Sequence, residues 1–156
     1  MAIKSKWVTW PELEPYREQL VDMEYELMVK YHYPDRMIPR TYPEKRVANL
    51  ENALDSGNTF LWITTDGPLL LGYYWAYISS FIDKRRWNLR SIMFADSSKG
   101  LGLGNLAIKE GLKKAKELNC DEAATEYVPW NKPMENLMRR NGFSVSRIEV
   151  VKELKD

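Results

Sequence analysis

The chain has 156 residues, enough for one domain with a substantial core and too few for two comfortable ones. Its 23 Lys and Arg residues nearly cancel its 22 Asp and Glu residues, so no net field favours nucleic acid or a membrane surface as a partner. One cysteine excludes an intramolecular disulfide, no signal-peptide run begins the chain, and the longest apolar stretch, 69–78, is too short to span a bilayer. We expect a single cytoplasmic domain over 1–156.

The N-terminal part predicts one strand followed by two helices. A short strand over 6–10 runs into Thr9-Trp10-Pro11-Glu12, which has the spacing of a capping box. Apolar side chains at three- and four-residue intervals then predict an amphipathic helix over 13–31. A second box, Thr41-Tyr42-Pro43-Glu44, is expected to open another helix, which Gly57 ends.

The rest of the chain alternates between strands and helices. A small-residue loop over 96–104 precedes a helix over 103–118, and a short helix over 131–140 ends at Asn141-Gly142, a left-handed cap. Strands are predicted at 59–65, 69–80, 86–94 and 122–128, with one or two closing strands over 143–152. The order β-α-α-β-β-β-α-β-α-β predicts a mixed sheet with helices packed on it.

The sharpest chemical signal is the loop Lys99-Gly100-Leu101-Gly102-Leu103-Gly104, which follows the strand ending at Phe94 and opens a helix. Loop amides without side chains can approach an anion, and the helix N-terminus adds partial positive charge. A pyrophosphate is the ligand that we expect at such a loop. The G-x-G-x-G spacing does not fit the dinucleotide fingerprint, and no Gly-Lys-Ser/Thr follows to make a P-loop. A glycine-rich turn without a ligand is the alternative.

This loop resembles the central motif of the GNAT superfamily of acetyl-CoA-dependent acyltransferases, Arg/Gln-x-x-Gly-x-Gly/Ala, with Lys99 in the first position. Asn131, Leu137 and Gly142-Phe143 resemble the second motif of that superfamily at its usual separation. The resemblance implies an α/β (α+β) GNAT fold, in which a mixed, mostly antiparallel sheet is splayed between strands four and five.

The resemblance also implies acetyl-CoA as the co-substrate, with no metal. Pantetheine would bond to the backbone near Phe94, and its pyrophosphate would sit on the loop amides. The implied cofactor-binding residues are Phe94, Lys99, Gly100, Leu101, Gly102, Leu103, Gly104, Asn131 and Asn136. The residues themselves give no support for a metal, since no His/Cys cluster has ligand spacing.

Acyl transfer to an amine needs a base, because an alkylamine of pKa about 10.4 is mostly protonated at neutral pH. Glu126, on the fifth strand, is the candidate, in a place where some superfamily members carry a catalytic glutamate; a solvated strand carboxylate is the other interpretation. Met138 stands where many relatives have a tyrosine that protonates the leaving thiolate, and a thioether cannot donate a proton. Water or another tyrosine, such as Tyr127 or Tyr73, would have to substitute.

The acceptor is expected near the end of the first long helix, the region that frames the acceptor pocket in this superfamily. Tyr31, His32 and Tyr33 are the candidate substrate contacts there, although a lone histidine is more often structural. Arg86, Asn88 and Arg90 share one face of the fourth strand by alternation. They form either a solvated edge or a surface that favours an acceptor bearing a carboxylate or phosphate.

Together these features predict an N-acetyltransferase that moves acetyl from acetyl-CoA to a primary amine by direct attack in a ternary complex. The expected partner is a small-molecule or peptide amine, with neither nucleic acid nor a membrane involved, and a homodimer remains open. One alternative is a non-catalytic acyl-CoA-binding regulatory module. The other is a toxin-like acyltransferase acting on charged tRNA or a peptide.

Overall fold

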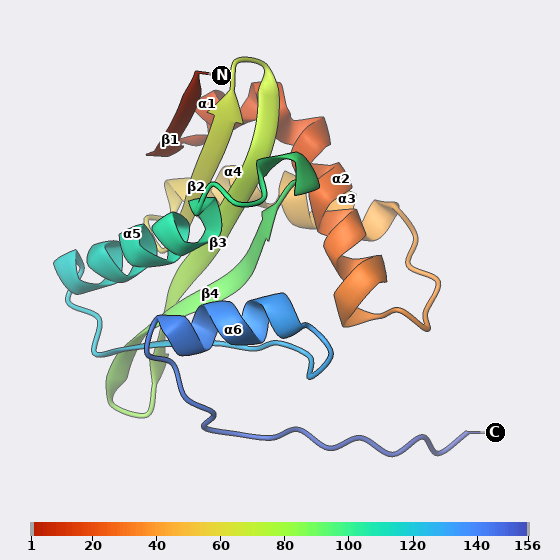
Figure 1. The fold of residues 1–156 in the computed structure, drawn as a ribbon. Coiled ribbons are helices and arrows are strands. Elements are labelled where there is room, and N and C mark those ends of the chain that lie inside the picture. Colours follow the sequence, from red (N-terminus) through yellow and green to blue (C-terminus); the bar gives the residue numbers. More distant parts are fainter. Residues whose placement is uncertain (1, 156) are drawn as a thin grey trace.

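Five strands form one sheet in which spatial order follows chain order, as a computed structural model of residues 2–155 shows (Figure 1). The strands are β1 (Ile3–Trp7), β2 (Thr59–Asp66), β3 (Leu69–Phe81), β4 (Lys84–Phe94) and β5 (Glu122–Thr125). The helices are α1 (Trp10–Leu13), α2 (Arg17–Leu27), α3 (Thr41–Ala48), α4 (Leu50–Asp55), α5 (Leu103–Glu117) and α6 (Lys132–Arg140). All neighbouring strands are antiparallel except β4 and β5, which are parallel. The predicted mixed, mostly antiparallel α/β fold is confirmed.

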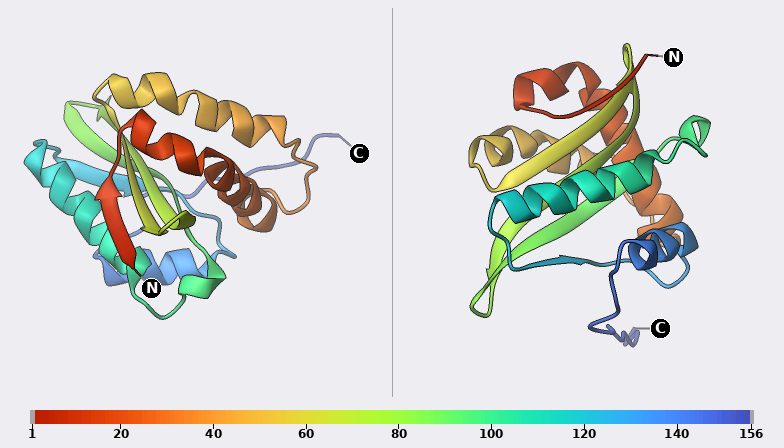
Figure 2. Two further views of the ribbon diagram at one scale, coloured as in Figure 1. Left: turned by 90° about the horizontal axis from the view of Figure 1, so that it is seen from above. Right: turned by 60° about the vertical axis from the view of Figure 1, so that its left-hand side comes forward.

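Helices cover both faces of the sheet, α1 to α4 on one and α5 and α6 on the other (Figure 2). Strand β3 supplies both cores, because alternate side chains point to opposite faces. Tyr73 and Trp75 pack toward the α1–α4 side, whereas Tyr74 and Ala76 pack toward α5 and α6. This two-sided burial explains why β3 reads as a continuous apolar run rather than an alternating one.

The capping box at Thr9 is confirmed. The Glu12 carboxylate accepts a hydrogen bond from the Thr9 backbone N–H (3.2 Å) and forms an ion pair with Lys6. The Lys6 ammonium and then the Thr9 donors lower the pKa of Glu12 from 4.5 to about 2. Because Thr9 is the cap, Trp10 is the first helical residue and the first strand lies at Ile3–Trp7 rather than 6–10.

The second predicted box is wrong, although the helix it introduced is present. Thr41 is itself the first residue of α3, and Arg40 occupies the cap position. Glu44 does not reach back to a threonine amide, because its carboxylate pairs with the Arg40 guanidinium (3.3 Å). Asp22 of α2 also pairs with Arg40 (2.7 Å), which joins the start of α3 to α2.

A β-bulge interrupts β4 at Arg90. Trp75 of β3 pairs with Ser91 and Ala76 pairs with Leu89, which leaves Arg90 as the extra residue. The parallel ladder between β4 and β5 ends at the same level, at Leu89↔Thr125, while β4 continues to Phe94. A bulge bends and twists its strand, so the two strands part where the bulge lies. The predicted opening between the fourth and fifth strands is therefore present.

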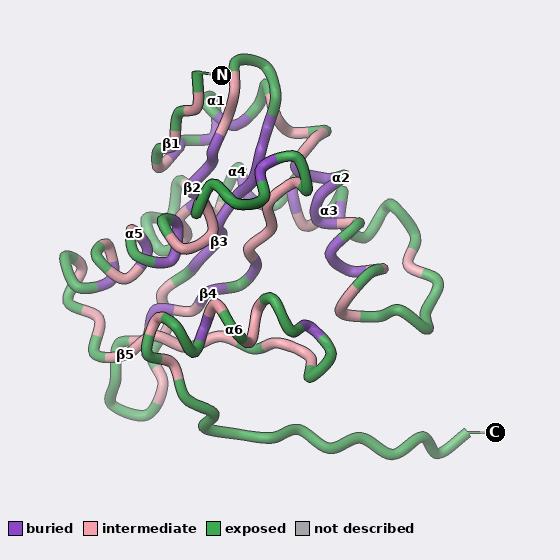
Figure 3. Tube along the Cα trace, in the orientation of Figure 1, coloured by how far each residue is buried: buried purple, intermediate pink, exposed green. Residues whose placement is uncertain are grey.

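The closing strands predicted over 143–152 do not form. Residues 144–155 have no regular secondary structure and extend away from the sheet, exposed along their length (Figure 3). Apolar residues such as Ile148 and Val150 gave this segment its strand-like pattern, yet both side chains are exposed. A strand needs the backbone groups of a neighbouring strand, which local sequence cannot supply. The short helix before the segment ends as predicted, with Gly142 left-handed (φ 84°).

Candidate active site

The glycine loop connects β4 to α5 and leaves the start of that helix open. Gly100 (φ 82°) and Gly102 (φ 71°) lie in the left-handed region, where a side chain would be strained. Gly102 is the cap residue and brings no side chain to the first amides of α5. Those amides have no intrahelical acceptor, and the helix dipole adds positive charge there. The loop can therefore receive an anion such as a pyrophosphate.

The other predicted members of the loop are exposed at its surface. The Lys99 ammonium pairs with Asp96 three residues earlier (3.1 Å), and the Leu101 side chain is half exposed. Gly104 differs from the other two glycines, because its φ is not positive and an added Cβ would meet only ordinary contacts with Phe94 and Leu137, at 3.8 and 3.7 Å. Neither backbone conformation nor crowding within the protein requires a glycine there.

The structure brings the end of β4, the glycine loop and α6 together. Phe94 lies against Gly72 of β3, where any side chain would overlap the phenyl ring. The same ring approaches Gly104 at the first turn of α5. The Asn141 side chain at the end of α6 donates to the Asn105 side chain (2.9 Å). The two predicted cofactor motifs are therefore neighbours in space.

Asn131 is buried at the start of α6, and its side-chain oxygen accepts a hydrogen bond from the Met134 backbone N–H (3.2 Å). It is thus a helix cap, which is compatible with a second contact to a ligand. Asn136 is exposed on the same helix. Met138 is buried in the core beneath α5 and α6, where its thioether packs as an apolar side chain.

Glu126 lies just beyond the last paired residue of β5. Thr125 is fixed to β4 by its backbone pairing with Leu89 and by its hydroxyl, which donates to the Leu89 carbonyl (3.0 Å). Ala123 and Tyr127 pack toward α5 and α6, so alternation directs the exposed Glu126 toward the opposite, α2 side of the sheet. Glu126 on one side and Arg90 on the other therefore flank the opening between the strands.

The end of the first long helix is a π-helical turn over Met28–His32, a feature that is frequent at functional sites. The Trp130 indole N–H donates to the Tyr31 carbonyl (2.7 Å), which fastens this turn to the segment after β5. Burial lowers the pKa of His32, so its ring is mostly neutral at pH 7. Of the predicted acceptor residues, Tyr31 is thus fixed to Trp130, in the segment that follows β5 and Glu126.

A hollow of about 210 Å³ lies beside this turn and is lined by Tyr33, Arg36, Ile38, Pro39 and Tyr42. Tyr33 therefore faces a space in which a small molecule could contact it. Met37, in the same loop, points into solvent with its side chain 99% exposed, so it is not part of the hollow.

A buried carboxylate on the α2 side of the sheet was not anticipated from the sequence. Glu24 is 1% exposed, and its Oε1 accepts hydrogen bonds from the hydroxyls of Tyr73 and Ser91, each at 2.6 Å. Its Oε2 faces Arg46 of α3 at 3.5 Å. The signal was the position of Glu24 within the apolar stripe of the helix, between Leu20 and Leu27. A charged residue in such a stripe indicates a buried polar partner.

This network removes Tyr73 as a substitute proton donor. Burial, and then the Glu24 carboxylate, raise the pKa of Tyr73 well above its ordinary value. Its hydroxyl is directed at Glu24 and is fully enclosed by the α1–α4 core. A phenol held in this way keeps its proton, and it is separated from the opposite core where Met138 lies.

The three polar residues of β4 that were expected to share a face have different environments. Arg86 pairs with Glu122 of β5 (3.2 Å), and the Asn88 amide donates to the Ser79 hydroxyl (2.9 Å). Arg90 nevertheless stays on the shared face, because Trp87 and Leu89 point toward α5 and α6 whereas its guanidinium lies over Trp75 of the α1–α4 core, 5.1 Å from the ring centroid.

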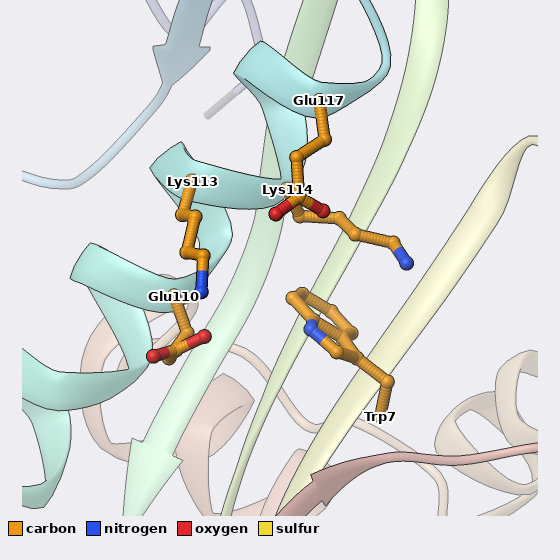
Figure 4. A pocket seen from close by; sticks show the side chains of 5 residues that line it. All are labelled: Trp7, Glu110, Lys113, Lys114 and Glu117. Atoms are coloured by element: carbon orange, nitrogen blue, oxygen red, sulfur yellow. The ribbon is translucent and has the colours of Figure 1, made fainter.

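A second hollow, of about 170 Å³, lies between α5 and β1, away from all predicted site residues (Figure 4). Trp7 forms its floor, and two lysines and two glutamates of the C-terminal half of α5 surround it. Opposite charges balance there, and no predicted site residue lies in this hollow.

Within residues 2–155, no three His, Cys, Asp or Glu side chains gather in a way that could hold a metal ion. None of the helices in this range is both long and apolar enough to cross a membrane.

Comparisons with known proteins agree with this arrangement. The model of the acetyltransferase (GNAT) family matches residues 18–143. The chain is 26% identical over 106 residues to YdgE, an uncharacterized N-acetyltransferase of Bacillus subtilis (strain 168), covering 67% of this chain and 68% of YdgE. A predicted acetyltransferase of Clostridium acetobutylicum, solved with acetyl-CoA, superposes with a TM-score of 0.76 at 12% identity, covering 97% and 96% of the chains. The aminoglycoside acetyltransferase AAC(6')-Iy, solved with a CoA-based bisubstrate analogue, superposes over the full length of both chains (TM-score 0.70, 15% identity).

Proposed function

Since this chain belongs to the acetyltransferase (GNAT) family and is an acyltransferase, we propose that it acetylates a primary amine with acetyl-CoA by direct attack in a ternary complex. The amine nitrogen attacks the thioester carbonyl, the C–N bond forms, and the C–S bond breaks. The amine loses one proton, and the CoA thiolate leaves and takes up a proton. The products are an N-acetyl amine and CoA.

The proposal rests most heavily on the opening between β4 and β5. The ladder stops at Leu89↔Thr125, so the edge of β4 from Arg90 to Phe94 lacks a strand partner on that side. These free backbone groups can bond the amides of a pantetheine arm, as a missing strand would. At the end of this edge, the amides of Gly100, Gly102 and the first turn of α5 are available to the pyrophosphate, whereas those of Lys99 and Leu101 already donate to the Asp96 and Ser98 carbonyls.

Glu126 is proposed as the base that takes the proton of the amine. It stands at the mouth of the opening, it is exposed, and it is directed toward the side where Tyr31, His32 and Tyr33 would meet the acceptor. No comparable acid is available on β4, since none occurs between Lys84 and Phe94. The leaving thiolate takes its proton from water or from Tyr127, which packs on the same side of the sheet as Met138, because Met138 cannot donate one and Tyr73 is held by Glu24.

The proposed class of acceptor is based first on the structural neighbours. AAC(6')-Iy is an aminoglycoside N-acetyltransferase and has been solved with a bisubstrate analogue that joins CoA to an acetylneamine. The hollow of about 210 Å³ beside Tyr33 is also of a size for part of a small molecule. A small amine or a peptide amine is therefore the proposed partner.

Two glycine variants test cofactor binding. Gly57 and Gly102 both have positive φ and open space where a Cβ would stand, so alanine should strain each backbone similarly. Gly57 follows α4, far along the chain from the loop, and serves as the matched control. CoA should raise the melting temperature of the wild type and of Gly57→Ala, and this rise should be lost in Gly102→Ala. Equal CoA responses in both variants would contradict the proposed loop.

Glu126→Gln tests the base. A general base typically contributes about 10²–10⁴-fold, so CoA thiol release with an amine should fall by about 100-fold while the CoA-induced melting shift is unchanged. The rate of the variant should recover as pH approaches the amine pKa, because the amine then loses its proton without help. Glu117→Gln, an exposed glutamate of α5, is the control. If Glu126→Gln retains activity within about threefold of Glu117→Gln, instead of losing the expected general-base contribution, then Glu126 is not the base.

A further inference from the structure

Two arginines from different elements converge on one indole ring on the α2 side of the opening. The guanidinium carbons of Arg46 (α3) and Arg90 (β4) lie 5.5 and 5.1 Å from the centroid of Trp75. Both guanidinium groups contact the same ring, and partial burial, followed by the charge of Arg46, lowers the pKa of Arg90. Two like charges held at one ring repel each other unless an anion joins them.

The carboxylate nearest to this pair does not neutralise it. Glu24 contacts only Arg46, at 3.5 Å, and its other oxygen is already occupied by the Tyr73 and Ser91 hydroxyls. Within residues 2–155, no carboxylate lies in ion-pair distance of Arg90. The Arg46 Nε is also buried with no acceptor among these residues. With two cations and one anion, the cluster keeps a net positive charge.

The cluster lies where an acceptor must pass. Arg90 is the bulge residue at which β4 and β5 part, directly opposite the level of Glu126. Tyr42 belongs to α3, the helix that carries Arg46, and lines the hollow of about 210 Å³ beside Tyr33. Arg90 therefore lies at the opening, and Arg46 lies on a helix that forms part of the wall of the hollow.

We propose that the acceptor amine carries an anionic group, a carboxylate or a phosphate, which Arg90 and Arg46 bind beside Trp75. This inference rests on the proposed acetyl transfer and narrows its substrate class. Guanidinium groups suit both anions, because their donors form paired, charge-assisted hydrogen bonds to carboxylate and phosphate oxygens. The same charges disfavour a polycationic acceptor such as an aminoglycoside, which would bring further positive charge to this place.

Matched amines test the proposal on the full chain. Tyrosine is compared with tyramine, phenylalanine with phenethylamine, and O-phosphoethanolamine with ethanolamine, and neamine represents the polycations. Acetylated product is measured by mass spectrometry, and binding is measured separately by the melting shift that each amine gives in the presence of CoA. The anionic member of at least one pair should be favoured by about tenfold or more in kcat/KM and should give the larger melting shift.

Arg90→Gln should reduce this preference to below about twofold by lowering kcat/KM for the anionic amine more than for its matched partner, and Arg90→Lys should restore part of it. Arg17→Gln is the control, because Arg17 also lies over an indole, that of Trp10 (5.8 Å), but far from the bulge. A preference for the amino acids identifies a carboxylate, and a preference for O-phosphoethanolamine identifies a phosphate.

Failure of this inference and failure of acetyl transfer give different results. Three results would overturn the anionic acceptor and leave acetyl transfer standing. All matched amines could be acetylated without preference, the preference could survive Arg90→Gln, or neamine could give the highest rate of acetylation. Anion-selective melting shifts that depend on Arg90, with no acetylated product from any amine, support the anion site and overturn the transfer reaction.

Discussion

Replacing Glu24 with leucine removes the acceptor that Tyr73 and Ser91 share. Each hydroxyl donates to Oε1 at 2.6 Å, and Tyr73 is fully buried while Ser91 is 5% exposed. A buried donor left without its partner costs about 1–3 kcal/mol, so the two together cost about 2–6 kcal/mol. Removal of Glu24 also leaves Arg46 without its carboxylate, and breaking a buried ion pair costs about 3–5 kcal/mol, so the net loss in the free energy of unfolding should be about 3 kcal/mol or more.

Urea unfolding at pH 7 measures this loss, and a double-mutant cycle with Tyr73→Phe isolates the pair. Tyr73→Phe removes the stranded hydroxyl, so it should cost less in the leucine background than in the wild type, with a coupling of at least about 1 kcal/mol. Glu26→Leu, an exposed site two residues along the same helix, should change stability by less than about 0.5 kcal/mol. A cost below about 1 kcal/mol for Glu24→Leu, or strict additivity with Tyr73→Phe, would refute the network as a source of stability.

Three further predictions concern packing, pH and the thiolate. Gly111→Ala should destabilise by about 1–3 kcal/mol in urea despite the better helix former, because its Cβ would overlap the buried Tyr74 ring; a more stable variant would contradict that packing. The depressed pKa of Glu12 (about 2) stabilises the fold above pH 4.5, and this contribution is lost as pH falls toward 2. Melting curves across this range should show a smaller acid loss for Glu12→Gln than for the wild type, and identical curves would contradict the assignment. Met138→Leu should keep its rate of thiol release, because the buried thioether donates no proton; loss of activity with CoA binding intact would give Met138 a role in turnover.

Features that depend on neighbouring residues in the chain were predicted well from the sequence. The Thr9 cap, the glycine loop after β4 and the left-handed cap at Gly142 all depend on residues a few positions apart. Their backbone conformations follow from side chains that accept a nearby amide or from the lack of a side chain. The roles of Glu126 and of the loop residues stay predictions until the experiments above are done.

Features that depend on distant partners were predicted poorly. The segment over 143–152 has a strand's composition but no strand beside it, and Glu44 pairs with Arg40 instead of closing the expected box at Thr41. The bulge at Arg90 was not predicted either, and it puts the next residue, Ser91, on the α2 side of the sheet, where it bonds to Glu24. Register and ion pairing are settled between segments, so spacing within one segment does not specify them.

The sequence by itself determined the order of elements up to Gly142, the mixed sheet and the position of the glycine loop before α5, because short-range hydrogen bonds and side-chain periodicity encode them. Only the tertiary structure decided which charges meet. Glu24 finds its donors 49 and 67 positions away, and Trp130 fastens to Tyr31 across 99 positions. The unpaired charge of Arg90 likewise depends on which carboxylates the fold brings within reach. The role of a charged side chain depends on its partners, and the packing of α2 and α3 against the sheet determines which partners lie within reach.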